Sequence, residues 1–137
     1  MEQNSNEALQ NKQVGKLGEQ IAANYLKNKG FEVIGMNYLK KWGEIDVIGK
    51  KDKKVHFVEV KTVSYETKQA LAASVSRGTW KPEDNVHVDK IRKLSRAIES
   101  WIGENNYKGD WQIDVVAVKI VSCEKFATVK YMENIVL

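Results

Sequence analysis

Residues 43–62 read GEIDVIGKKDKKVHFVEVKT, and they predict two strands joined by a tight turn. Apolar runs at 44–50 and 55–63 flank the lysine-rich stretch KKDKK, as in a β-hairpin. Both strands nevertheless carry charge where a buried strand usually carries none: Asp46 in the first, and Glu59 and Lys61 in the second. Because side chains alternate across a strand, we expect Glu59 and Lys61 on one face, with Asp46 close to them on the neighbouring strand.

These charges allow two interpretations. A buried carboxylate without a partner is costly, and two carboxylates close together repel each other. In the first interpretation Lys61 simply pairs with Glu59 on a solvated face of the sheet. In the second, Asp46 and Glu59 share a divalent cation, since carboxylates suit Mg²⁺ or Mn²⁺. The second arrangement has the chemistry needed for phosphodiester hydrolysis, with Lys61 assisting at the phosphate.

The composition of the chain predicts one globular domain with an anionic partner. The 137 residues suit a single domain, which we place at 11–137 after a flexible polar N-terminus at 1–10. A formal net charge of +4 favours nucleic acid as the partner. The single cysteine, Cys123, cannot form an internal disulfide. With no signal peptide and no membrane-length apolar run in the sequence, we expect a soluble cytoplasmic protein.

Periodicity along the chain predicts an α/β fold. Helical spacing of apolar residues appears at 14–26 and again at 88–102. A loop at 64–85, with a short helical piece in it, separates the hairpin from the second helix. The expected strands are 31–39, 44–50, 55–63, 111–121 and, as one more at the C-terminus, 126–137. The order helix, three strands, helix and one or two strands fits a central mixed sheet flanked by helices.

Three motifs together resemble the YraN-like family of the PD-(D/E)xK nuclease superfamily, whose members are restriction-endonuclease-like and Holliday junction resolvase-like. The helix motif is GKLGEQIAANYL (15–26), the paired strand motifs are GEIDVIG and HFVEVKT, and the late strand is QIDVVAV (112–118). The resemblance covers roughly residues 14–120. It implies a restriction-endonuclease-like core and a Mg²⁺- or Mn²⁺-dependent nuclease acting on DNA.

Site residues follow from that resemblance. It implies that Asp46, Glu59 and Glu19 are catalytic metal ligands, with Glu19 an added ligand or supporting acid, and that Lys61 is the catalytic lysine. Two positions depart from the family pattern, because Val63 and Gln112 stand where arginines are common. Asp114 fits a structural role as well as a functional one. Other residues near the motifs have milder interpretations: Glu44 as a surface charge or loop support, and Gly43 as a place where substrate backbone approaches.

The second helix supplies the candidate nucleic-acid contacts Lys90, Arg92, Lys93 and Arg96. Lys90 lies at the edge of the apolar arc, so we expect it to face the site, and the other three to face solvent or phosphate. Trp42 and Trp80 fall in predicted loops, where an aromatic ring can stack on a base. Packing is favoured for Trp42 and base stacking for Trp80.

Three functional hypotheses follow. The favoured one is a metal-dependent endonuclease that cuts DNA, with branched or junction structures as candidate substrates. An alternative is a non-catalytic nucleic-acid-binding module that retains the fold, and a third is an interaction protein in which Glu59 and Lys61 merely pair. A homodimer would place two cuts symmetrically on a junction, but no stretch of the sequence identifies its interface.

Overall fold

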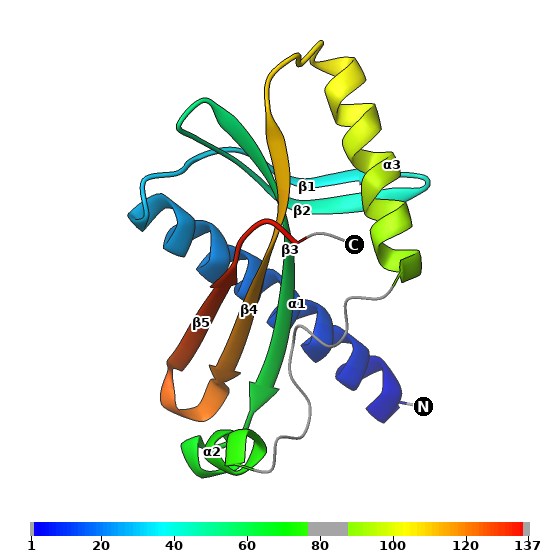
Figure 1. The fold of residues 1–137 in the computed structure, drawn as a ribbon. Coiled ribbons are helices and arrows are strands. Elements are labelled where there is room, and N and C mark those ends of the chain that lie inside the picture. The colour runs from blue at the N-terminus through cyan, green and yellow to red at the C-terminus, as the bar shows by residue number, and fades with distance from the viewer. Residues whose placement is uncertain (1, 77–87, 136–137) are drawn as a thin grey trace.

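The computed structural model describes residues 2–76 and 88–135, which form one five-stranded sheet and its helices. The predicted Trp80 contact lies outside the described residues. The elements are α1 (Glu2–Asn28), β1 (Glu32–Lys40), β2 (Gly43–Lys51), β3 (Lys54–Tyr65), α2 (Lys68–Ser76), α3 (Val88–Glu104), β4 (Trp111–Val121), the 3₁₀ turn η2 (Ser122–Glu124) and β5 (Phe126–Met132). The α/β class and the extra C-terminal strand are therefore confirmed (Figure 1).

The sheet is mixed, with strand order β1-β2-β3-β4-β5. Only β3 and β4 run parallel, and the other neighbours are antiparallel. The predicted hairpin is present: Asp52 and Lys53 form its two-residue turn, and both have positive φ, at 52° and 64°. Two consecutive left-handed residues are typical of the hairpin turns whose twist matches that of the strands.

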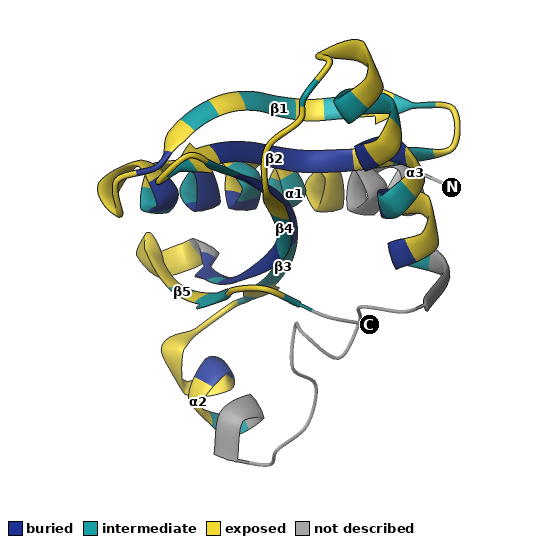
Figure 2. Cartoon of the chain, turned by 45° about the horizontal axis from the view of Figure 1, so that its top comes forward, coloured by how far each residue is buried: buried dark blue, intermediate teal, exposed yellow. Residues whose placement is uncertain are grey.

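Two hydrophobic clusters hold the helices on opposite faces of the sheet. On one face α1 packs Ala22 and Leu26 against strand residues that include Val58 and Val116. On the other face α3 packs Leu94, Ala97 and Ile98 against the hairpin formed by β2 and β3. Figure 2 shows the buried residues running along β2 and β3, which are covered by these helices. The C-terminal half of β3, which carries Glu59 and Lys61, is thus near both helices.

Several boundaries differ from the sequence prediction. The helix α1 begins at Glu2 instead of near Val14, and β3 continues to Tyr65. The helix α2 occupies part of the predicted loop, as the short helical piece did in the prediction. The strand β5 ends at Met132 and not at 137, because Asn134 turns into left-handed backbone with φ 53°. The predicted flexibility of residues 1–10 stays a prediction.

None of the helices in the described part of the chain is long and apolar enough to cross a membrane.

Candidate functional site

Asp46 lies where β2 separates from β3. Paired residues run from Lys51 opposite Lys54 to Val47 opposite Val58, and the pairing stops there. One residue further, the Oδ2 atom of Asp46 accepts a hydrogen bond of 2.8 Å from the backbone N–H of Val60. The side chain thus replaces the backbone partner that β3 loses. Asp46 is only 8 % exposed, so the charged residue is built into the sheet itself.

Two more carboxylates meet Asp46 at this point. One carboxylate oxygen each from Glu19, Glu44 and Asp46 lies within 4.8 Å of the other two. Glu19 comes from α1, whereas Glu44 precedes Asp46 by two residues on β2. Glu19 therefore lies next to Asp46, and its role as a ligand stays a prediction. Glu44, for which the sequence predicts a surface charge or a support for the loop, joins the group. We call Glu19, Glu44 and Asp46 the carboxylate group.

Gly18 explains why α1 can bring Glu19 so close. A Cβ atom at Gly18 would overlap the side chain of Thr62 on β3. The absent side chain therefore lets the helix lie directly on the end of the strand. Gly15, one turn earlier, has open space around it, so closeness is required at Gly18 alone of these two.

Glu59 stands beside the carboxylate group but is already paired. Its Oε1 atom is 2.5 Å from the Nζ atom of Lys90 and 3.6 Å from that of Lys61. The structure thus brings Lys90 into the site, as the arc of α3 predicted. It also places Lys61 next to Glu59. Glu59 can bind a metal ion only if Lys90 leaves Oε1 or the ion takes the other carboxylate oxygen.

The pKa shifts reflect crowding of negative charge. Burial, followed by repulsion from Glu59, raises the pKa of Asp46 to about 8, although the hydrogen bond from Val60 opposes the shift. Burial and then Glu44 raise the pKa of Glu19. Each of these two carboxylates is therefore destabilised in its charged form, as expected where a cation would be bound favourably.

The two lysines respond in opposite directions. Burial and then the neighbouring charge of Lys90 lower the pKa of Lys61. Burial alone would lower the pKa of Lys90 as well, but its contacts with Glu59 and Lys61 outweigh burial and raise it. Lys90 is thus the firm ion-pair partner of Glu59, and Lys61 is the less firmly protonated amine.

An open cleft of about 640 Å³ contains these residues. Its walls come from α1, β2, β3 and α3, and Lys93 lines it together with Lys90. Gly43 also lines it, but a Cβ atom there would overlap the carbonyl oxygen of Lys93. The close approach of α3 is therefore sufficient reason for glycine at this position, and the approach of substrate backbone there stays a prediction.

The remaining predicted contacts fall in different places. Arg92 and Arg96 are exposed on α3, and neither lines this cleft. Arg96 lies beside Trp42 in a neighbouring groove. Trp42 is not packed away, since 43 % of its surface is exposed.

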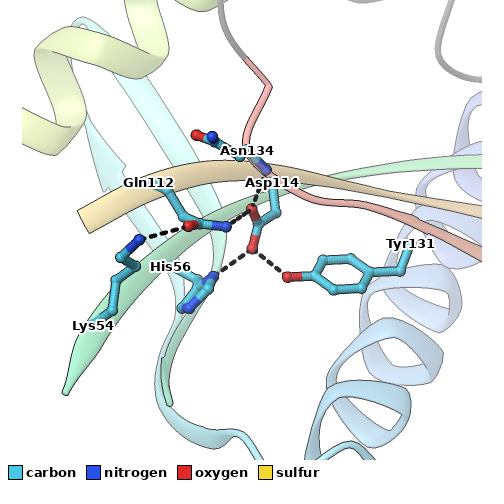
Figure 3. Close-up of polar contacts among 6 residues, drawn as sticks. All are labelled: Lys54, His56, Gln112, Asp114, Tyr131 and Asn134. Carbon is cyan, nitrogen blue, oxygen red and sulfur yellow. Dashed lines mark hydrogen bonds and ion pairs between the residues drawn. The ribbon is translucent and has the colours of Figure 1, made fainter. Parts of the chain in front are cut away.

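Asp114 belongs to a separate network on the α1 side of the sheet (Figure 3). Its Oδ2 atom lies 2.6 Å from both His56 Nδ1 and the hydroxyl of Tyr131, which donates to it. Its Oδ1 atom accepts hydrogen bonds from the side chain of Gln112 and the backbone of Asn134. Asp114 is fully buried and does not line the cleft. Of the two roles that the sequence left open, the structure supports the structural one.

Sequence reasoning did not identify this network. The sequence carries one signal for this network, in the motif QIDVVAV (112–118). There Gln112 stands two residues before Asp114, so the two polar side chains are expected on the same face of the strand. The parallel register then sets His56 directly opposite Gln112, and only the tertiary structure provides that register.

Comparison with known proteins gives one consistent result. Residues 18–118 match the model of the uncharacterised protein family UPF0102. A UPF0102 protein of Alkaliphilus oremlandii is 35% identical over 127 residues, which are 90% of this chain and 97% of the relative. Similar proteins of Campylobacter fetus and Campylobacter jejuni are 35% and 32% identical, and each match covers 88% of this chain and 91% of the relative. The predicted resemblance to the YraN-like family is thus confirmed, and the chain belongs to the uncharacterised protein family UPF0102.

Proposed function

We propose that this protein is a divalent-metal-dependent endonuclease that hydrolyses DNA phosphodiester bonds, with branched or junction DNA as candidate substrates. The observation that carries the proposal is the convergence of three carboxylates from α1 and β2 within 4.8 Å, in an open cleft beside two lysines. Carboxylates and cations from distant parts of the chain meet there, at the point where β2 separates from β3.

The donor set fits Mg²⁺ or Mn²⁺. Both are hard cations that take oxygen ligands, and Mg²⁺ usually keeps several waters while one or two carboxylates and a substrate phosphate complete its shell. We assign Asp46 and Glu19 as the principal ligands, with Glu44 adding a third carboxylate from the exposed side. Glu59 keeps its predicted ligand role as an alternative to its pair with Lys90. When bound, the ion would activate a water molecule and offset charge on the phosphate.

The chain's own residues have distinct parts in this proposal. The backbone N–H of Val60 fixes one oxygen of Asp46, so the carboxylate is held in one orientation before any ligand arrives. Lys61 presents a mostly buried amine next to Glu59, where it can donate a hydrogen bond to a phosphate oxygen. Lys90 is more exposed and can bind a second phosphate oxygen if it releases Glu59.

A cleavage assay tests the proposal directly. Labelled single-stranded, duplex, flap and four-way-junction DNA would be incubated with Mg²⁺, Mn²⁺ or EDTA. We expect metal-dependent cutting that is abolished by Asp46→Asn and by Lys61→Ala. The matched controls are Asp52→Asn and Lys50→Ala, which remove the same charges from the exposed end of the hairpin. Cutting that survives Asp46→Asn, or that EDTA does not stop, would refute the proposal.

One observation favours the non-catalytic binding module instead. Lys90 and Lys61 already neutralise Glu59 without a metal ion. If the protein binds nucleic acid equally well in Mg²⁺ and EDTA and cuts none of the substrates, this module is the better description. A cytoplasmic location, the preference for DNA over RNA and a homodimer stay predictions.

A further inference from the structure

A row of cations leads away from the carboxylate group along α3. Lys90, Lys93 and Arg96 follow one another at intervals of three residues. Residues at this spacing are neighbours on a helix surface, and each step advances about 4.5 Å along the axis. Lys90 contacts Glu59, Lys93 lines the cleft, and Arg96 lies beyond it. The row therefore starts at the site and ends outside it.

Trp42 stands at the far end of this row. It forms the turn between β1 and β2, and with Arg96, Glu99 and Ser100 it lines a groove of about 440 Å³. Its Nε1 atom donates a hydrogen bond of 3.1 Å to the Ser100 hydroxyl, which itself donates to the carbonyl of Arg96. The close approach of Gly43 to Lys93 holds the same turn on α3. The indole is thus fixed at its edge, while 43 % of its surface remains exposed.

The charges around Trp42 suit a phosphate backbone. Lys93 and Arg96 are exposed, and neither forms an ion pair with another residue that the structure describes. Lys41, which precedes Trp42 in the turn, is exposed as well. Among the residues that the structure describes, Glu99 is the one acidic residue that lines the groove. An aromatic platform between cations is the arrangement with which proteins bind single-stranded nucleic acid.

We infer that Trp42, Lys93 and Arg96 form a binding strip for an unpaired nucleic-acid strand, with a base stacked on Trp42 and phosphates on the two cations. The inference rests on the proposed function, and it narrows the substrate class to nucleic acid with an unpaired segment next to the cleavage site. A base inside a duplex is already stacked on both sides and presents no free face to the indole. Trp42 therefore discriminates unpaired from paired strands.

The test measures binding without cleavage. Fluorescence anisotropy in EDTA would follow a labelled single strand of about 20 nucleotides and the matching duplex. Trp42→Leu should weaken single-strand binding about tenfold, since one base stack contributes about 1–3 kcal/mol. Duplex binding should change less than about twofold, because the bases of a duplex have no free face that could stack on Trp42. Trp42→Phe keeps an aromatic ring, so it should retain most of the affinity.

Matched controls are available in the same molecule. Trp111 has the same exposed fraction as Trp42, 43 %, but packs on Phe57 away from this groove, so Trp111→Leu should leave binding unchanged. Arg96→Gln should weaken binding to both the single strand and the duplex. It should also reduce the slope of log affinity against log salt concentration by about the amount that one phosphate contact contributes. Lys27→Gln removes a positive charge from the exposed last turn of α1, which packs on the opposite face of the sheet from α3, and it should leave both the affinity and its salt dependence unchanged.

The outcomes separate this inference from the proposed function. Equal losses for Trp42→Leu and Trp111→Leu, equal losses for single strand and duplex, or a Phe variant as weak as the Leu variant would each overturn the inference. If the wild type cuts DNA with metal but Trp42→Leu binds normally, the inference fails and the function stands. If nothing is cut with any metal but the Trp42 pattern appears, the binding strip stands and the catalytic proposal fails. Thermal melting of each variant shows whether a loss reflects unfolding.

Discussion

Replacing Asp46 by asparagine should stabilise the metal-free protein, although Asp46 is the residue on which the proposed function depends most. Asparagine has nearly the same shape and keeps an oxygen that can accept the hydrogen bond from Val60. It removes the negative charge that is buried beside Glu59 and Glu19. A residue that costs stability in the resting protein is expected where a ligand must later be bound.

The sign of the pH dependence follows from the direction of the shift. The pKa of Asp46 is about 8 in the folded protein, against 3.8 as its ordinary value. Between these values the folded protein holds a proton that the unfolded chain has released, so the free energy of unfolding falls as pH rises through this window. Asparagine does not titrate. The stability advantage of Asp46→Asn should therefore be small near pH 4 and grow until about pH 8.

The magnitude can be bounded from the same numbers. A shift of about four pKa units, at about 1.4 kcal/mol per unit, sets an upper limit of about 6 kcal/mol. Part of the shift of Asp46 comes from repulsion by the neighbouring carboxylates of Glu59, Glu19 and Glu44, and such coupled contributions do not add independently. We therefore expect the variant to gain about 2–3 kcal/mol at pH 8.

Urea unfolding in EDTA between pH 4.5 and 8.5 measures this difference. Asp52→Asn is the control, because Asp52 is exposed in the hairpin turn and asparagine tolerates its left-handed backbone. Addition of Mg²⁺ should then reverse the order, by stabilising the wild type and leaving the variant unchanged. A difference that does not change with pH, or a wild type more stable than Asp46→Asn at pH 8 in EDTA, would refute the reasoning.

Three further predictions concern the surroundings of the site. Gly18→Ala should lower the free energy of unfolding by about 1–3 kcal/mol, because the added Cβ overlaps Thr62. Gly15→Ala should raise the free energy of unfolding by about 0.5–1 kcal/mol, because the space around Gly15 is open. Urea unfolding of both variants measures these changes, and equal effects would contradict the close-packing argument. Asp114→Ala leaves four hydrogen-bond donors without their acceptor and should cost about 3–5 kcal/mol in the same assay, so a loss below about 1 kcal/mol would show that the network is dispensable. Lys90→Gln removes a charge that lowers the pKa of Lys61, so an NMR titration of the Lys61 side chain should show a higher pKa, and an unchanged value would contradict the coupling.

Local patterns predicted most of the fold. The apolar spacing of α3 and the alternation around KKDKK are strong signals, and the structure has both elements close to their predicted bounds. The strict alternation fails at one place. Ile45 packs in the cluster on the α3 side while Val47 packs on the α1 side. The regular pairing of β2 with β3 ends between them, and no local pattern marks that point.

The candidate site was predicted unevenly for the same reason. Charges inside apolar strands pointed to Asp46, Glu59 and Lys61, because such charges are costly unless they are partnered. Glu44 lies two residues before Asp46, which is the spacing for a shared face, but it is the first residue of the predicted strand and so resembles an ordinary surface charge. The pair between Lys90 and Glu59 joins two residues that are 31 positions apart in the sequence, and the fold alone establishes it.

The site exists because the sheet divides. After Val58 the strand β3 stays paired with β4 as far as Tyr65, but it has lost β2 on its other side. An unpaired N–H inside the sheet would be costly, and Asp46 satisfies it by turning its carboxylate toward Val60. An apolar residue at position 46 would leave that N–H without a partner, so the fold itself requires an acceptor there. An acceptor alone could be neutral, however, as asparagine is. The fold therefore does not account for a carboxylic acid at position 46, gathered with Glu19 and Glu44 against its own electrostatic cost, whereas the proposed metal ligand would.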